Sequence, residues 1–152
     1  MIKQPFTQWI MNDKHEQGVV LVIGQKVAKT LIGWNPVNDR IITVCFHSTC
    51  TKTTVVQVCA PVEDSNSEDR DAFYDQLHDV FDEIPCHDHK VVLANMTALL
   101  GNNGDCFQHV VGPFVIVQCT NDNVACLRLF YNLIGVCTGN SYFQYKMIHK
   151  KI

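Results

Sequence analysis

The sequence has no excess of positive charge and none of the long apolar segments that mark secretion or membrane insertion. It carries 12 Lys or Arg residues against 15 Asp or Glu residues, whereas nucleic-acid binders usually show a strongly basic footprint. No stretch reaches the roughly 18 apolar residues of a membrane span, and residues 1–5 lack the apolar run of a signal peptide. We therefore expect an intracellular protein, nuclear or cytoplasmic, with no membrane partner.

The sequence also lacks the spacings typical of redox and phosphate-binding motifs. Its eight cysteines include no C-x-x-C pair, and most of them lie in apolar surroundings, which predicts reduced, buried thiols. Nothing local marks one of them as a thiolate nucleophile paired with a histidine. The loop of residues 101–104 has two glycines but no following Lys and Ser or Thr to cradle a phosphate. The cysteines are Cys45, Cys50, Cys59, Cys86, Cys106, Cys119, Cys126 and Cys137.

The chain does have enough apolar residues for a packed core. Its apolar fraction is 47% and its charged fraction 18%, and 152 residues is the size of one domain, for which about 100–150 is most common. Residues 1–14 show little pattern and are interpreted as an N-terminal arm. Residues 15–152 are interpreted as one domain, because they contain neither an internal repeat nor a linker.

Two short elements are predicted before residue 40. Residues 18–24, G-V-V-L-V-I-G, are apolar without alternation, which predicts a strand buried on both faces. Residues 25–31 are long enough for two helical turns with Val27, Ala28 and Leu31 inward. A Gly-Trp-Asn-Pro sequence then ends that helix, because the residue before a proline is pushed out of the helical region.

A β-α-β unit is predicted in the middle of the chain. Residues 40–47 and 54–60 are strand-like and joined by a short polar link, which indicates a hairpin. Residues 65–84 then form a helix, and residues 90–93 a further strand. The second strand of the hairpin and the strand after the helix should be parallel neighbours, with a right-handed crossover.

The helix over 65–84 has both a start signal and an apolar face. Ser65 and Glu68 have the spacing of a capping box, and Pro85 ends the helix. Apolar residues recur at helical spacing and predict an inward face. That face consists of Phe73, Leu77, Val80, Phe81 and Ile84.

The last third of the chain is less regular. Residues 114–119 are strand-like, residues 121–132 can form a helix capped by Asn121 or Asp122, and residues 133–137 are predicted to form a short strand. The basic residues of 146–151 are interpreted as a solvated tail.

Acidic residues are concentrated around the predicted helix. Ten Asp or Glu residues lie between Glu63 and Asp88, where Arg70 is the one Lys or Arg residue. A solvated helix face explains this run, and its spacing does not support a metal-binding patch.

A zinc site is a second interpretation of one loop. Cys86, His87 and His89 follow the helix, and the two histidines share a face if the segment is extended. His47 or His109 would have to supply the fourth ligand through the fold. A polar loop between a helix and a strand is the simpler interpretation.

Several motifs resemble those of a known family. Residues 56–61, V-Q-V-C-A-P, resemble a Q-x-Y-A-P strand end, and residues 91–98, V-V-L-A-N-M-T-A, resemble V-V-L-G-D-F-N-A. The segments D-A-F-Y-D-Q-L at 71–77 and I-H-K at 148–150 also fit. Over residues 15–150 the chain is similar to the endonuclease/exonuclease/phosphatase superfamily, in its retrotransposon-endonuclease branch. Within that branch it resembles the craniofacial development protein 2-like group.

This resemblance implies a fold and a chemistry. The fold is α/β, a partial sandwich of two stacked sheets with outer helices. The family chemistry is Mg²⁺-dependent cleavage of a phosphodiester by an activated water, so nucleic acid is the partner of intact relatives.

The positions of the family's site residues carry other residue types here. The family's Asp in G-D-x-N falls on Asn95, its Asn on Thr97, its Tyr in Y-A-P on Cys59, and the Gly before the Asp on Ala94. Activating water requires a carboxylate, and so does holding Mg²⁺. We therefore expect no functional catalytic residue, no metal ligand and no cofactor.

Family members also carry an early Glu and a late Asp-His pair, which neither residues 1–14 nor the segment ending at Ile152 shows. The expectation is a truncated, degenerate endonuclease-like domain, a transposon-derived remnant or pseudoenzyme, prone to self-association through uncovered sheet edges. Two alternatives stay open. One is a protein-interaction module that uses the scaffold and its acidic helix. The other is residual Mg²⁺-dependent endonuclease activity on DNA, with Asp105 or Asp122 recruited as ligands.

Overall fold

The structure, a computed structural model, describes residues 18–62, 64–96, 110–114, 130–131 and 134–144. They fall in two compact units. The first unit comprises the described residues up to Ala60 together with Asp79–Met96, and the second comprises Pro61–His78 together with the described residues from 110 onward. The long helix of the chain passes from the second unit into the first between His78 and Asp79.

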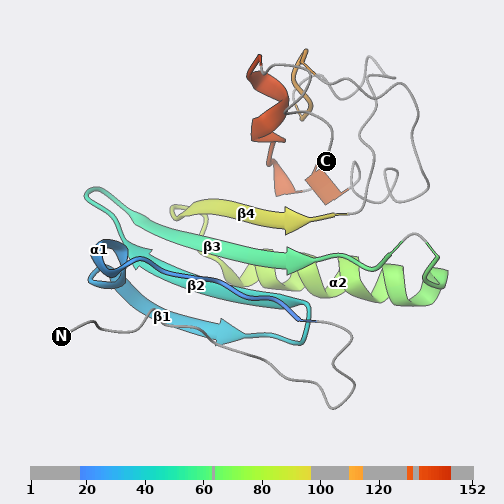
Figure 1. The fold of residues 1–152 in the computed structure, drawn as a ribbon, viewed down its shortest axis with the longest axis horizontal. Helices are drawn as coiled ribbons and strands as arrows, with labels where there is room; N and C mark the ends of the chain where they lie inside the picture. The colour runs from blue at the N-terminus through green and yellow to red at the C-terminus, as the bar shows by residue number, and fades with distance from the viewer. Residues whose placement is uncertain (1–17, 63, 97–109, 115–129, 132–133, 145–152) are drawn as a thin grey trace. The chain divides into compact units, whose positions relative to one another are not determined.

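The first unit is built on a four-stranded mixed sheet in the order β1-β2-β3-β4 (Figure 1). The first three strands are antiparallel neighbours, and β4 is parallel to β3. The predicted hairpin and the parallel pairing across the helix are therefore confirmed, as is the α/β class. The strands are β1 Leu31–Pro36, β2 Ile41–His47, β3 Lys52–Cys59 and β4 His89–Asn95.

The helix between β3 and β4 is α2, Ser67–Glu83. It begins two residues later than predicted, and its cap is Asn66 and not Ser65, because the Asn66 Oδ1 accepts a hydrogen bond of 2.6 Å from the Asp69 backbone N–H. A side-chain acceptor one residue before the first helical turn satisfies one of the unpaired N–H groups there. The predicted inward face is confirmed, since Phe73, Leu77, Val80, Phe81 and Ile84 are all buried.

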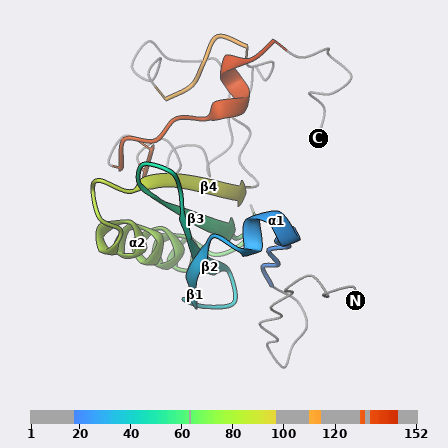
Figure 2. The same cartoon turned by 90° about the vertical axis from the view of Figure 1, so that its left-hand side faces the viewer.

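The two faces of the sheet have different covers. Thr43 and Thr54, on one face of β2 and β3, line a pocket together with Val80 and Glu83 from the last turns of α2. The opposite face is covered by residues 18–24, and Figure 2 shows α2 and this N-terminal segment on opposite sides of the sheet. Its buried core consists of Val19, Ile23, Ile42 and Val44.

The prediction of a strand over residues 18–24 is wrong. Apart from a single bridge at Ile23, the segment has no strand structure. Val19 and Ile23 are buried, but Val20 and Val22 are 41% and 65% exposed. The segment therefore packs one apolar side onto the sheet and is not one of its hydrogen-bonded strands. Its uninterrupted apolar run did not mean that both sides are buried.

The prediction for residues 25–31 is correct only in part. A helix does form, but α1 spans Gln25–Ala28 alone and has no buried residue, with Val27 50% exposed. Leu31 already belongs to β1, which continues through the Gly-Trp-Asn-Pro sequence that was expected to end the helix. Antiparallel pairing with β2, from Leu31 opposite Phe46 to Pro36 opposite Ile42, overrides the local signal.

In the second unit, the predicted strand over 133–137 is also wrong. Ile134 is helical, and Gly135 adopts a φ of 67° while its N–H donates to the Tyr131 carbonyl at 3.0 Å. A glycine in this left-handed conformation ends a helix. The expected turn at Gly139-Asn140-Ser141 is present as the 3-10 helix η2, Gly139–Tyr142. The elements predicted over 114–119 and 121–132 lie largely outside the described residues.

Candidate functional site

The candidate site lies where β3 and β4 end. Parallel strands bring their carboxyl ends to the same edge of a sheet, and the register places Cys59 directly opposite Asn95. The Ala60 N–H donates to the Asn95 carbonyl at 2.9 Å, so the pairing continues one residue past β3. The parallel pairing predicted for the strands on either side of the helix therefore places Cys59 and Asn95 next to each other.

Arg40, the residue before β2, is hydrogen-bonded to one of these two residues, Cys59. The Cys59 N–H donates to the Arg40 carbonyl at 3.0 Å, and the Arg40 Nη1 donates to the Cys59 carbonyl at 3.3 Å. A guanidinium therefore lies beside the end of β3. Sequence analysis did not identify Arg40, although the predicted hairpin carries the signal, since residue 40 precedes a strand that must pair with 54–59.

Cys59 and Asn95 differ in their surroundings. Cys59 is half-buried and packs against the apolar cluster beneath residues 18–24, whereas Asn95 is exposed. Cys59 forms no disulfide. The next residue, Met96, is buried at 8% exposure and anchors the strand end. The edge thus presents a carboxamide to solvent and keeps the thiol partly covered.

These donors do not fit a magnesium ion. Mg²⁺ prefers hard oxygen ligands in an octahedral arrangement, usually including one or two carboxylates, whereas the paired strand ends carry a thiol and an amide. Within the described residues no three His, Cys, Asp or Glu side chains are grouped so as to hold a metal. The positions Thr97, Asp105, His109, Asp122 and His149 lie outside the described residues.

The two histidines considered as zinc ligands do not converge on one point. The His89 ring Nδ1 lies 3.2 Å from the Thr51 hydroxyl, and the His87 Nε2 lies 3.5 Å from a carboxylate oxygen of Asp88. The side chain of His87 is 76% exposed and that of Asp88 is 3% exposed. The two histidines thus have separate partners, and the buried member of the loop is Asp88, which sequence analysis did not single out.

The prediction of buried cysteines is wrong for three of the five cysteines that the structure describes. Cys45, Cys50, Cys59, Cys86 and Cys137 are free thiols. Cys45 and Cys59 are half-buried, but Cys50, Cys86 and Cys137 are exposed because they lie in turns or loops and not on inward faces. Cys106, Cys119 and Cys126 lie outside the described residues. Among the helices in the described part of the chain, none is long and apolar enough to cross a membrane.

The chain is similar in sequence to craniofacial development protein 2. It is 31% identical over 85 residues to the protein of Bos taurus and 29% identical over 85 residues to that of Tragulus javanicus. Each match covers 56% of this chain but only 14% and 15% of the respective relative. No protein-family profile matches the chain, and no solved structure matches it. The resemblance to craniofacial development protein 2 is confirmed over this half of the chain, and the wider superfamily stays a prediction.

Proposed function

We propose that this chain is an endonuclease-like domain, of the two-sheet α/β type, that has lost phosphodiesterase activity. The observation that supports the proposal most directly is the pairing of Cys59 with Asn95 at the ends of β3 and β4. The resemblance assigns a tyrosine and an aspartate to these positions. In this proposal, the paired strand ends correspond to the family's site and carry different residue types.

The substitution at residue 95 removes the charge that hydrolysis needs. A carboxamide neither takes a proton from water at neutral pH nor neutralises a divalent cation. Removing a general acid or base typically lowers the rate by about 10²–10⁴-fold. The thiol of Cys59 cannot replace a phenol as a hydrogen-bond donor of the same reach. The two changes act on the same reacting group, so an inactive domain, a transposon-derived remnant or pseudoenzyme, is the expected result.

Nicking of supercoiled plasmid DNA in the presence of Mg²⁺ tests this proposal. The purified chain should nick no faster than a control variant that carries alanine at Asn95, His109 and His149. An Asn95→Asp variant extends the test by restoring the carboxylate. Its nicking should stay at background, because Cys59 and Thr97 still differ from the family's residues. Nicking by the unaltered chain above the triple variant would overturn the proposal.

A second function is supported by the surface of α2. Seven of its carboxylates are exposed, and its last turn contains no basic residue. A helix that presents one sign of charge to solvent can guide a basic protein partner to its surface. We propose as an alternative that the chain is a protein-interaction module. The exposed residues are Glu68, Asp69, Asp71, Asp75, Asp79, Asp82 and Glu83.

Charge reversal distinguishes this alternative. A saturable protein partner recovered with the unaltered chain should be lost from an Asp71→Lys, Asp75→Lys variant. The matched control reverses two exposed charges at α1 and its C-cap, Lys26→Glu and Lys29→Glu, and should retain the partner. Equal loss from both variants, or retention in the first, argues against a role for the acidic helix.

A further inference from the structure

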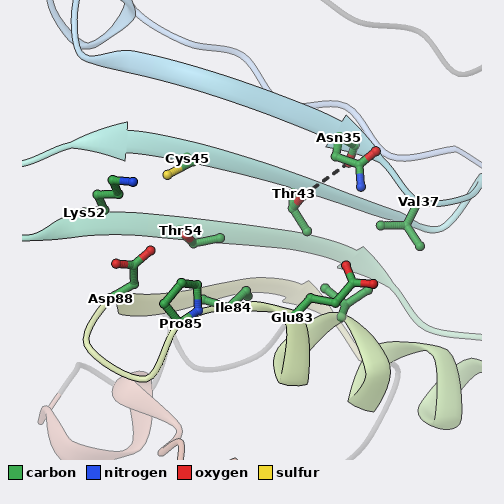
Figure 3. A pocket seen from close by; sticks show the side chains of 11 residues that line it. Asn35, Val37, Thr43, Cys45, Lys52, Thr54, Glu83, Ile84, Pro85 and Asp88 are labelled. Carbon is green, nitrogen blue, oxygen red and sulfur yellow. Dashed lines mark hydrogen bonds between the residues drawn. The ribbon is translucent and has the colours of Figure 1, made fainter.

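A pocket of about 260 Å³ lies between the end of α2 and the face of the sheet that does not carry residues 18–24. Strands β1, β2 and β3 form its floor, and the loop after α2 closes one side (Figure 3). The pocket is separate from the Cys59–Asn95 edge. Thr43 and Thr54 line the pocket on one face of the sheet, whereas Cys59 packs into the apolar cluster on the opposite face. Binding of a ligand in this pocket is therefore independent of whether the chain has nuclease activity.

Asp88 is the unusual residue of this pocket. Its side chain is 3% exposed, and its Oδ1 accepts no hydrogen bond. The nearest group of opposite charge is the largely solvated His87 ring, whose Nε2 is 3.5 Å away. Figure 3 shows the Asp88 carboxylate pointing from the loop toward β3, beside Lys52 and Thr54. Burying a carboxylate oxygen without a hydrogen bond costs free energy, so such an atom in a pocket marks a place where a bound donor would be stabilising.

The position of Asp88 is fixed by the backbone. Its N–H donates to the Pro85 carbonyl at 3.1 Å, and both residues line the pocket. The next residue, His89, begins β4 and pairs with Thr53 of β3. The backbone of Asp88 is thus held between a helix end and a strand start.

The remaining lining defines the chemistry of a ligand. The ionisable side chains with a fixed sign are Lys52, Glu83 and Asp88, which sum to a formal charge of −1. Neither Lys52 nor Glu83 forms an ion pair with another described residue. Val37, Val80 and Ile84 supply apolar surface. A ligand that complements this pocket has one positive charge that donates hydrogen bonds, followed by a short apolar body.

We propose that the pocket binds a small organic cation of this class, a primary ammonium compound, through Asp88. The ammonium donates to the carboxylate and the alkyl part lies against the side chains of Val37, Val80 and Ile84. Small-molecule sites combine such an apolar lining with a few fixed polar groups.

Butylammonium chloride is the probe that tests the proposal, with 1-butanol as a neutral analogue of the same shape and sodium chloride at equal ionic strength. Backbone amide chemical shifts are followed during each titration of the full chain. The ammonium should produce saturable shifts at residues 52–54 and 83–88, and neither butanol nor salt should do so. Equal shifts from butanol, or shifts outside these residues alone, would overturn the proposal.

Two variants make the test specific. Asp88→Asn should weaken butylammonium binding at least about tenfold, because a hydrogen bond to a buried charge is lost. Asp79→Asn, an exposed change on α2, should leave binding unchanged. Thermal unfolding without ligand provides a second readout: Asp88→Asn should unfold at the same or a higher temperature, since it removes a buried charge whose Oδ1 accepts no hydrogen bond. A lower unfolding temperature, or unaltered binding, assigns Asp88 a structural role and refutes the site.

Discussion

Gly112 lies where the chain around it leaves no room for a side chain. Its N–H donates to the Ser141 Oγ at 2.7 Å, and the Ser141 carbonyl accepts the Phe114 N–H at 3.0 Å. A Cβ at this position would lie 2.5 Å from that carbonyl oxygen and 2.8 Å from the Tyr142 ring. Contacts this short with backbone atoms cannot relax through a side-chain rotation, so the requirement for glycine is steric.

Gly112→Ala should therefore lower the free energy of unfolding by about 1–3 kcal/mol, the usual effect of overpacking. Gly139→Ala is the matched control, because a Cβ there meets no atom within 4 Å. Urea denaturation of the two variants and the unaltered chain measures the difference. Equal stabilities for the two variants would contradict the steric argument.

Tyr131 couples the stability of the second unit to pH. The residue is 8% exposed, and burial raises the pKa of its phenol above the ordinary value of 10.0. Below pH 10 the phenol is protonated in both states, so it adds no pH dependence. Above pH 10 the phenol ionises in the unfolded chain but stays neutral in the folded chain. Stability is therefore lost as the pH rises from 10 toward the folded-state pKa.

Tyr131→Phe should reduce this alkaline loss, because phenylalanine has no proton to lose. The measurement is the free energy of unfolding in urea at pH 7.5 and at pH 10.5. We expect the difference between the two pH values to be smaller in the variant than in the unaltered chain. An equal difference in the two proteins would show that the buried phenol does not cause the loss of stability at alkaline pH.

The element that organises the chain is α2, and each of its ends is stabilised by a different means. At the first turn, Asn66 supplies a local cap. At the last turn, which has no basic residue of its own, Lys90 from β4 donates from Nζ to the Phe81 carbonyl at 3.0 Å. The same Nζ lies 5.7 Å from the centroid of the Phe81 ring. A cation near a helix C-terminus offsets the unpaired carbonyls there.

Asn66→Ala should destabilise the chain by about 1 kcal/mol, as loss of an N-cap usually does. Ser65→Ala should have little effect, even though the sequence pattern favours Ser65 as the cap. Circular dichroism during thermal unfolding distinguishes them. A larger effect at Ser65 would mean that the capping box of the sequence pattern, and not the Asn66 hydrogen bond, begins the helix.

For the molecule as a whole, β4 presents an apolar surface. Within the described strands it pairs on one side only, with β3. Val91 and Leu93 are 41% and 43% exposed on the face opposite α2. Edge strands with exposed apolar side chains favour association between chains. Self-association through β4 is therefore the expected behaviour at high protein concentration.

Leu93→Lys should shift the sedimentation coefficient toward that of the monomer, because a charge on an edge strand opposes pairing. Val62→Lys changes an apolar residue that is 59% exposed but lies outside the sheet, and it should have no such effect. Analytical ultracentrifugation over a range of concentrations provides the readout. A single monomeric species at every concentration of the unaltered chain would rule out association through β4.

Local periodicity was enough to predict several parts of the fold. The face of α2, the hairpin of β2 and β3, and the parallel pairing of β3 with β4 all followed from spacing and from the connection rule for parallel strands. Those rules also brought Cys59 and Asn95 together. Each of these predictions needs only a repeat of two or of 3.6 residues and the connection between neighbouring elements.

Other features depend on contacts between segments that are far apart in the chain, and these appeared only in the folded structure. Residues 18–24 have the composition of a strand, yet they lie on the sheet as a packed segment, with Val19 and Ile23 against the buried face of β2. Lys90 reaches the end of α2, and Asp88 is buried without a hydrogen bond at Oδ1, only because β4 starts beside that helix end. Whether a side chain is buried or hydrogen-bonded depends on segments that are distant in the sequence. A local sequence pattern therefore cannot predict it.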